Sequence, residues 1–417
     1  MRAKCENVRF GCWVPPMPDG NYLVPGSFIT EERYREAKDM GLDFLIGHIE
    51  RGPQSADVKK ALQCAAATGL KYIIRWEDMI QYMDSSPEEL RNALGDSIEH
   101  EACMGVLVYD EPKADKFPMM GKLAELYRQV SDKYFYVNLF PFDAGEDLLG
   151  TPTYAEHLAL YDRYLKNDMV SMDIYPLRKK KGGYYVSACF LRNLEEIQNL
   201  CRKKQMEHWQ FVQGSMAYGI SKAPDYFDMR LQIYTSLCYG ATVLQYYCYC
   251  TPPIKAIMGK SKWTSMLDSY GNKTARYRAA KRLNAEVHGM GSVFMQYAAG
   301  WRGVMPVVGS ENPSGKNEAF DMLETPLQSH EDLISVAASQ DTIIGAFDGQ
   351  KGENAFMLVN YTVPAYRIQD SVRLTFRDAT KVIYYRAGKK HIVPTPEGRF
   401  DLTLAAGEGV FVIPVRE

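Results

Sequence analysis

The stretch Gly105-Val-Leu-Val-Tyr-Asp-Glu-Pro-Lys113 decides how the chain is interpreted. An apolar run over residues 105–109 ends abruptly in Asp110, Glu111 and Pro112, which is the pattern of a buried strand that stops on two adjacent carboxylates. In a parallel barrel, the carboxyl ends of the strands carry the chemistry. The sequence therefore predicts an acidic site at the end of this strand, with Glu111 as the first candidate for a catalytic acid.

Short apolar runs alternate with amphipathic segments over the first 290 residues. The apolar runs occupy residues 8–14, 44–48, 72–76, 106–109, 134–139, 169–174, 209–213 and 241–247. The amphipathic segments occupy residues 31–40, 55–68, 87–100, 119–131, 154–166, 186–204, 224–239 and 275–288. Alternation of this kind is typical of parallel strands with helical crossovers, and eight of each predict a closed (β/α)8 TIM barrel over residues 1–290.

The sequence pattern changes after residue 290. Residues 309–332 are polar and rich in Gly, Pro, Ser, Asn and Glu, which predicts a long loop. Strand-like runs then follow at residues 343–347, 355–361, 371–376, 381–386, 399–404 and 409–415. We expect a C-terminal antiparallel β-sandwich domain over residues 291–417.

Composition bears on partners, cofactors and location. The net charge of −2 gives no reason to expect nucleic acid or an anionic membrane, and no apolar run reaches the roughly 18 residues of a membrane span. The seven histidines form no zinc motif, so no metal or organic cofactor is expected. The nine cysteines sit mostly in apolar contexts, and residues 1–6 contain no signal-peptide segment. Both features favour the cytoplasm, with a trimmed secreted or periplasmic protein as the alternative.

Polar and aromatic side chains gather at the predicted carboxyl ends of the barrel strands. They are Trp13, His48, Glu50, Trp76, Glu77, Asp78, Asp110, Glu111, Asn138, Asp173, Tyr175, Gln213, Gln245, Tyr246 and Tyr247. Hydrolysis of a glycosidic bond requires two carboxyl groups, and sugars bind to hydrogen-bonding groups and aromatic faces. We therefore expect a carbohydrate substrate. Its predicted contacts are Trp13, Glu50, Trp76, Asp110, Asn138, Tyr175, Gln213 and Tyr246.

The strand endings resemble those of clan A glycoside hydrolases. Asp110-Glu111-Pro112 is similar to the Asn-Glu-Pro ending of strand four in that clan, with Asp in place of Asn. Ser171-Met-Asp-Ile-Tyr-Pro176 is similar to a strand-six ending in the β-galactosidase-like branch, and residues 404–412 resemble the closing strands of the sandwiches that follow such barrels. The resemblance implies a glycosidase in which Glu111 is the general acid/base.

Strand seven departs from the clan pattern. Gln213 stands where the clan carries its nucleophilic Glu, and an amide cannot form a glycosyl ester. Three alternatives remain: Asp173 supplies the second carboxylate, Asp110 orients a substrate N-acetyl group as an internal nucleophile, or strand seven has another register that brings Asp225 or Asp228 to the site. We favour Asp173, as nucleophile or as base for water.

Several candidates also have a purely structural interpretation. Glu50 and Glu77 suit surface ion pairs, and His48 suits a packed position at the barrel rim. Trp13 and Trp76 suit core packing as well as a sugar platform.

The remaining features leave alternatives open too. By strand alternation, one of Tyr246 and Tyr247 faces the barrel and the other faces the helices. The basic run at residues 178–181, with Lys255, Lys260 and Lys262, suits either a solvated loop or the recognition of an acidic sugar. The alternatives to a hydrolase are a non-catalytic glycan-binding protein, which Gln213 favours, and a lyase.

Overall fold

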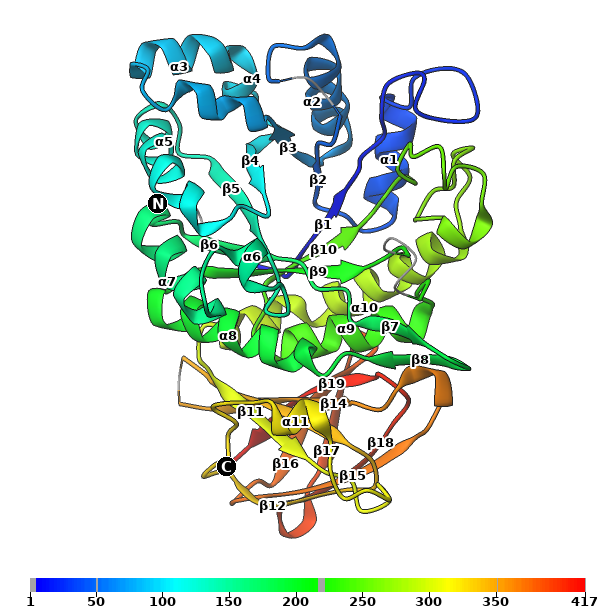
Figure 1. Ribbon diagram of the computed structural model, residues 1–417. Helices are drawn as coiled ribbons and strands as arrows, with labels where there is room; N and C mark the ends of the chain where they lie inside the picture. The colour runs from blue at the N-terminus through cyan, green and yellow to red at the C-terminus, as the bar shows by residue number, and fades with distance from the viewer. Residues whose placement is uncertain (1–4, 50–51, 217–221, 351, 417) are drawn as a thin grey trace.

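The computed structural model describes residues 5–49, 52–216, 222–350 and 352–416, and Figure 1 shows a barrel above a pair of sheets. Parallel strands close the barrel in the order β1-β10-β9-β6-β5-β4-β3-β2. They are β1 (Arg9–Trp13), β2 (Phe44–Ile46), β3 (Lys71–Arg75), β4 (Cys103–Asp110), β5 (Tyr134–Leu139), β6 (Met169–Met172), β9 (Glu207–Gln213) and β10 (Val243–Tyr247). The predicted TIM barrel is confirmed.

Helices surround the barrel strands. They are α1 (Glu31–Asp39), α2 (Ala56–Thr68), α3 (Pro87–Leu94), α4 (Asp96–Glu99), α5 (Phe117–Val130), α6 (Glu146–Leu149), α7 (Tyr154–Leu165), α8 (Cys189–Lys204), α9 (Tyr226–Cys238) and α10 (Ala275–Ala298). The single helix predicted over residues 87–100 is wrong. Gly95 divides it with φ 56° and ψ −157°, a conformation that only glycine adopts readily. None of the described helices is both long and apolar enough to cross a membrane.

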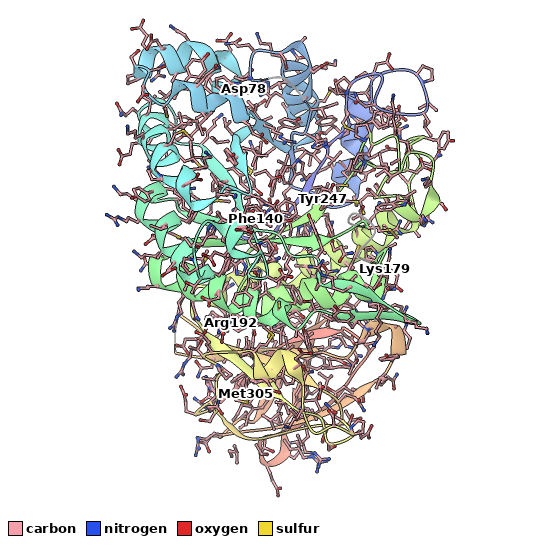
Figure 2. The ribbon with its side chains drawn as sticks, in the orientation of Figure 1. Asp78, Phe140, Lys179, Arg192, Tyr247 and Met305 are labelled. Atoms are coloured by element: carbon pink, nitrogen blue, oxygen red, sulfur yellow. The ribbon has the colours of Figure 1, made fainter. Side chains whose placement is uncertain are left out.

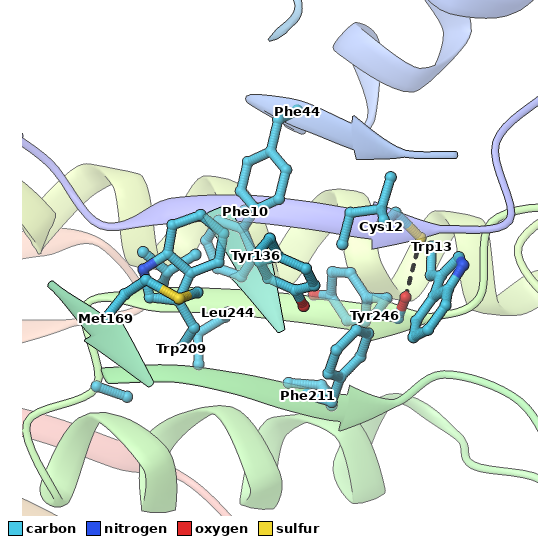
Figure 3. Close-up of a cluster of buried hydrophobic side chains, with 14 of the residues drawn as sticks. Phe10, Cys12, Trp13, Phe44, Tyr136, Met169, Trp209, Phe211, Leu244 and Tyr246 are labelled. Carbon is cyan, nitrogen blue, oxygen red and sulfur yellow. Dashed lines mark hydrogen bonds between the residues drawn. The ribbon is translucent and has the colours of Figure 1, made fainter. Parts of the chain in front are cut away.

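Large aromatic side chains fill the barrel interior, as Figure 3 shows. The Trp209 ring lies 5.3 Å from Phe44 and 5.6 Å from Tyr136 between ring centres. Nearer the carboxyl ends of the strands, the Trp13 ring lies 5.7 Å from Phe211. The interior is therefore a packed core, as is usual for this fold, and any chemistry is confined to the rim.

A hairpin that the sequence pattern did not predict follows β6. It consists of β7 (Leu177–Lys180) and β8 (Gly183–Val186), which pair antiparallel. The helix predicted from residue 186 begins later, at Cys189. The run of basic residues in β7 is exposed toward its end and shows no apolar alternation, so it resembled a loop.

The C-terminal strands form two antiparallel sheets. The larger sheet has the order β11 (Trp301–Val307), β13 (Thr342–Asp348), β14 (Asn354–Asn360), β19 (Gly409–Val415), β16 (Lys381–Arg386) and β17 (Lys389–Pro394). The smaller has the order β12 (Leu333–Ala338), β15 (Asp370–Phe376) and β18 (Arg399–Leu404). Phe356, Leu358, Leu374 and Val410 belong to the core that the two sheets share, so the predicted β-sandwich is confirmed.

Some C-terminal elements differ from the prediction. The pattern missed β11, β12 and β17. Strand β17 is mostly solvent-exposed and begins with three polar residues, which leaves little apolar signal. Strand β12 is largely apolar in sequence and was missed despite that pattern. The predicted loop over residues 309–332 contains the short helix α11 (Glu318–Asp321).

The larger sheet packs against the helices beneath the barrel. Helix α10 continues through Met290 to Ala298, so the chain passes from barrel to sheets after that helix and not at residue 290. From α10, the Phe294 ring lies 5.5 Å from both Phe347 of β13 and Phe411 of β19. A Cβ atom on Gly345 would lie only 2.2 Å from the carbonyl oxygen of Cys238, so β13 and α9 approach closely because this residue is glycine.

Candidate active site

Three carboxyl groups lie at the carboxyl ends of neighbouring strands. Asp110 is the last residue of β4, Glu111 follows it, and Asp173 follows the last residue of β6. Strand β5 lies between β4 and β6, with Asn138 paired in register with Asp110 on one side and Ser171 on the other. The barrel therefore gathers the predicted catalytic pair, Glu111 and Asp173, on one arc of its rim.

Asn138 links two of these carboxyl groups. Its Nδ2 donates a hydrogen bond of 2.7 Å to Asp173 Oδ1 and one of 3.2 Å to Asp110 Oδ1. Its Oδ1 accepts a hydrogen bond of 2.9 Å from Ser171 Oγ, which fixes the orientation of the amide. Asn138 is only 1 % exposed, so it holds the carboxylates and does not make the sugar contact that we expected.

A buried network beneath Asn138 fixes this arrangement. Tyr136 OH lies 2.8 Å from Ser171 Oγ and donates a hydrogen bond of 3.0 Å to Gln245 Oε1. Gln245 Nε2 donates to Ser171 Oγ at 3.1 Å. Gln245 was predicted only as a strand-end residue, and no role was predicted for Tyr136 or Ser171. Strand alternation could have found them, because each lies two positions before a rim residue and shares its face.

The surroundings of the three carboxyl groups raise their pKa values to different extents. Burial raises the pKa of Glu111 well above its usual range, and the nearby Asp173 and Asp110 raise it further. Burial and Asp173 raise the pKa of Asp110 to about 7, although Asn138 and Arg75 oppose the rise. Burial also raises the pKa of Asp173, but hydrogen bonds from Asn138 and Tyr175 favour its ionised form. Hydrogen bonds therefore favour the ionised form of Asp173, whereas burial and two acidic neighbours favour the protonated form of Glu111.

The backbone at Glu111 adopts an unusual conformation. Its φ is 52°, in the left-handed region that favours glycine, and its N–H donates a hydrogen bond of 2.8 Å to the carbonyl oxygen of Asn138. The following Pro112 is buried. Residues held in sparsely populated backbone conformations gather at functional sites, where the surrounding structure over-determines them.

A polar pocket of about 580 Å³ lies on one side of the carboxyl groups, at the ends of β2 and β3. His48, Ile49, Gly52, Arg75, Trp76, Glu77 and Asp78 line it. Arg75 donates to Glu77 Oε1 at 2.6 Å and to the His48 carbonyl oxygen at 3.0 Å. Burial and Arg75 lower the pKa of His48 to about 4, so its ring is neutral near pH 7. The pocket borders β4, and the positive charge of Arg75 acts to lower the pKa of Asp110.

An apolar pocket of about 360 Å³ lies on the other side, beyond the ends of β9 and β10. Ser215, Met216, Tyr247, Pro252, Ile254, Ala256, Ile257, Lys260, Lys262 and Trp263 line it. Figure 2 marks the two sides of the rim by Asp78 of the polar pocket and Tyr247 of the apolar pocket. The residues that line these two pockets do not include Glu111 or Asp173, which follow the intervening strands β4 and β6.

Gln213 ends β9, as the sequence predicts, but its side chain is committed to neighbouring backbone. Its Oε1 accepts a hydrogen bond of 3.3 Å from Leu177 N, and its Nε2 donates to the carbonyl oxygens of Ser215 at 3.3 Å and Lys222 at 2.7 Å. Gln213 therefore anchors the neighbouring loops and does not make the sugar contact that we expected.

The alternative register for strand seven is also wrong. Asp225 is the N-cap of α9, and the Asp228 side chain accepts from the backbone N–H of Asp225 in the same capping box. Both carboxylates therefore begin a helix and do not lie at a strand end.

Other predicted contacts have different surroundings. Tyr246 points toward the helices and donates a hydrogen bond of 2.6 Å to Asn284 Oδ1 of α10, so the expected sugar contact is wrong and Tyr247 is the tyrosine at the rim. Trp13 is buried between Phe211 and the guanidinium of Arg75, each 5.7 Å from its ring, which is core packing.

Trp76 lines the polar pocket, as the interpretation of this residue as a sugar platform requires. Glu77 forms an ion pair with Arg75, as its structural interpretation predicts. Glu50 lies outside the described residues. Within the described ranges, no group of three or more His, Cys, Asp and Glu has the geometry of a metal site.

Comparisons with known proteins show a shared fold. No protein-family model and no curated protein matches the chain. An α-amylase from Anoxybacillus has a TM-score of 0.56 and 10% identity, with 100% of both chains covered. A family 5 glycoside hydrolase from Bacteroides vulgatus ATCC 8482 has a TM-score of 0.53 and 10% identity, covering 98% of this chain and 89% of that one. A family 39 glycoside hydrolase from Bacteroides cellulosilyticus WH2 has a TM-score of 0.51 and 12% identity, covering 98% and 81%.

These similarities define the class of architecture. The chain has the fold of barrel glycoside hydrolases that carry additional C-terminal antiparallel sheets, which is the fold that the sequence resemblance implied. At identities of 10–12%, the similarity is one of fold.

Proposed function

We propose that this protein hydrolyses glycosidic bonds of an oligo- or polysaccharide by carboxylate acid/base catalysis. Glu111 protonates the leaving glycosidic oxygen, and Asp173 acts as nucleophile or as base for water. The fold neighbours that carry glycoside hydrolase names support a carbohydrate substrate, although a shared barrel does not by itself imply a shared function.

One observation carries the proposal: the surroundings separate the protonation of two carboxyl groups that influence each other. Asp173 accepts hydrogen bonds from Asn138 and Tyr175, which stabilise its negative charge. In the described part of the chain, Glu111 has no such donor, and two acidic neighbours oppose its ionisation. Glycosidases require this division, with one carboxyl protonated and the other ionised near neutral pH.

The stereochemistry of the product distinguishes the two roles of Asp173. A nucleophilic carboxylate forms a glycosyl ester and retains the anomeric configuration, whereas a base activates water and inverts it. We expect the first-formed anomer, observed by NMR during hydrolysis, to assign the role.

A second candidate function is glycan binding without turnover. Gln213 favours it, because this amide occupies the strand end where clan A hydrolases carry a nucleophile and its side chain is bonded to three backbone groups. Under this alternative, the carboxyl groups at β4 and β6 would bind hydroxyls and leave the glycosidic bond intact.

The experiment that separates the two functions is a panel of aryl glycosides and polysaccharides, including uronates, tested with the wild type and Glu111→Gln. The hydrolase proposal predicts turnover by the wild type and, for substrates whose leaving group needs protonation, a loss of about 10²- to 10⁴-fold in the variant. Tight sugar binding by both proteins without turnover by either would support the glycan-binding alternative. An acidic substrate, the further expectation from the basic residues, predicts faster hydrolysis of uronosides at low salt than at high salt.

A further inference from the structure

Two tyrosine rings connect the apolar pocket to the proposed catalytic carboxylate. Tyr247 lines the pocket at the end of β10, and its ring centre is 5.6 Å from that of Tyr175. Tyr175 in turn hydrogen-bonds Asp173. Tyr247 and Tyr175 therefore link the wall of the apolar pocket to Asp173, which places the pocket on the same side of the barrel rim as this carboxyl group.

The walls of this pocket suit an apolar ring better than a sugar. Met216, Tyr247, Ile257 and Trp263 contribute apolar surface, and Ile254 is 41 % exposed. The hydroxyl of the buried Ser215 already donates to its neighbour's carbonyl oxygen at 3.4 Å. Sugar hydroxyls placed here would lose hydrogen bonds to water with few replacements, which is unfavourable.

The rim of the same pocket is positively charged. Lys260 and Lys262 line it and are exposed, and neither forms an ion pair with a carboxylate among the described residues. The one acidic residue in the loop of residues 248–274 is Asp268, which accepts hydrogen bonds of 2.9 Å from the backbone N–H groups of Tyr270 and Asn272 in its own turn. The lysine charges are therefore available to an anion.

The polar pocket on the other side has the opposite character. Its arginine is paired with Glu77, and it offers imidazole, carboxylate and indole groups, which suit the hydroxyls and the apolar face of a sugar ring. The two pockets therefore differ in the kind of group that each would bind, and the carboxyl groups lie on the strands between them.

We infer that the apolar pocket binds the leaving group of the substrate, and that this group is an aromatic ring bearing an acid, held by Lys260 and Lys262. The inference rests on the proposed hydrolase function and adds a substrate class to it: a sugar joined to an aromatic acid. The pocket volume of about 360 Å³ falls within the range of roughly 300–1,000 Å³ that holds small molecules.

Binding of simple probes tests the pocket without any turnover. We expect calorimetry at low salt to show 2-naphthoate binding at least about 5-fold more tightly than the neutral 2-naphthalenemethanol. The preference should disappear in the double variant Lys260→Gln/Lys262→Gln and persist in Lys255→Gln, a matched lysine of the same loop that does not line the pocket. Both probes should bind more weakly to Trp263→Ala. Equal binding of the two probes by the wild type, or naphthoate binding unaffected by the double variant, would overturn the inference.

Kinetics then locate the acid on the substrate. The sugar that is hydrolysed best in the glycoside panel is prepared with a neutral phenyl leaving group and with a carboxyphenyl leaving group, and the corresponding uronoside with a neutral phenyl group is the third substrate. We expect kcat/KM to fall in Lys260→Gln/Lys262→Gln only for the carboxyphenyl glycoside. A fall only for the uronoside would place the acid on the sugar and contradict the inference. If no glycoside is hydrolysed, the proposed function fails, and the binding of 2-naphthoate still decides whether the pocket takes an aromatic acid.

Discussion

At the scale of single residues, the site depends on the amide of Asn138, which donates hydrogen bonds to two carboxyl groups. Asn138 donates to Asp173 at 2.7 Å and to Asp110 at 3.2 Å, and Ser171 holds the amide in place. These hydrogen bonds favour the ionised forms of the two aspartates, whereas Glu111 receives none in the described part of the chain. The difference in hydrogen bonding, added to burial and mutual repulsion, separates the proposed acid from the proposed nucleophile.

The substitution Asn138→Ala tests this separation. Loss of the amide removes a donor that lowers the pKa of Asp173, so that pKa rises and the carboxylate is lost at a higher pH. We expect the acidic limb of the kcat/KM profile to move upward by about one pH unit.

The matched control is Asn167→Ala, since Asn167 is also buried and its Nδ2 donates to the Phe135 carbonyl oxygen at 3.0 Å, at the start of β5 and away from the rim. It should lower stability and leave the profile in place. An unchanged profile in Asn138→Ala would contradict the assignment.

The pH dependence of stability gives a second test at this scale. Burial raises the pKa of Asp110 to about 7 in the folded protein. The stabilisation that the protonated Asp110 carboxyl gives the folded state is therefore fully present below the unfolded pKa near 4 and is lost as pH rises through 7. Asp110→Asn stays neutral, and we expect urea unfolding to show its stability relative to the wild type increasing between pH 4 and pH 8, by on the order of 2 kcal/mol.

Asp401→Asn is the control of opposite sign. Hydrogen bonds from Arg373 and Arg399 lower the pKa of Asp401, so the ionised form stabilises the fold above the unfolded pKa. This variant should lose stability relative to the wild type as pH rises. The same trend in both variants would argue against a buried, destabilised Asp110.

At the scale of elements, the end of β9 has a structural task. Gln213 fastens the segment after β6, through Leu177 N, to the segment after β9, through the carbonyl oxygens of Ser215 and Lys222. These segments border the apolar pocket and the carboxyl site. An amide suits this position because it both accepts and donates, which a carboxylate cannot do.

The substitution Gln213→Glu places a nucleophile of the clan A type at this strand end. A buried carboxylate would face two carbonyl oxygens without a proton to donate, and we expect the free energy of unfolding to fall by about 2–4 kcal/mol with no gain in turnover. Gln129→Glu, on an exposed part of α5, should change neither quantity. A rise in glycosidase activity in Gln213→Glu would instead indicate that the seventh barrel strand, β9, is the position of the nucleophile.

Strand alternation and helix periodicity were sufficient to predict the barrel elements and the position of Asp110, Glu111 and Asp173. The hairpin β7–β8 and the exposed strand β17 were not predictable from apolar patterning, because their residues bury little surface. Strand β12 has an apolar sequence and could have been predicted from it. The network that orients Asn138 joins residues as far apart as Tyr136 and Gln245, and such contacts exist only once the barrel closes. The direction of Tyr246 likewise depended on strand register, which a single residue does not reveal.

At the scale of the whole molecule, the sheets form the support on which the lower barrel helices rest. Figure 1 shows the sandwich beneath α8, α9 and α10. Arg230 of α9 donates to the Ala406 carbonyl oxygen at 2.5 Å, and the Phe294, Phe347 and Phe411 rings pack edge to face across the junction. A contact surface of this apolar kind predicts that barrel and sandwich unfold together.

The substitution Gly345→Val tests this coupling. Any side chain at this position meets the backbone of α9, so we expect a loss of about 1–3 kcal/mol or more in the free energy of unfolding. Thermal unfolding should remain a single transition at a lower temperature, and activity should disappear with it. Gly183→Val, in strand β8 with open space around it, should cost little. Two separate transitions in Gly345→Val would contradict the coupling.

The most direct test of the central claim, that Glu111 donates the proton to the leaving oxygen, is the dependence of hydrolysis on leaving-group acidity in Glu111→Gln. A 2,4-dinitrophenyl leaving group departs without protonation, whereas a 4-methylumbelliferyl group needs some help from an acid and a methyl group needs the most. We predict that the variant retains most of the wild-type rate for bond cleavage in the dinitrophenyl glycoside and loses about 10²- to 10⁴-fold for the methyl glycoside. An equal loss for every leaving group, or no loss for any, would contradict the role of Glu111 as the acid.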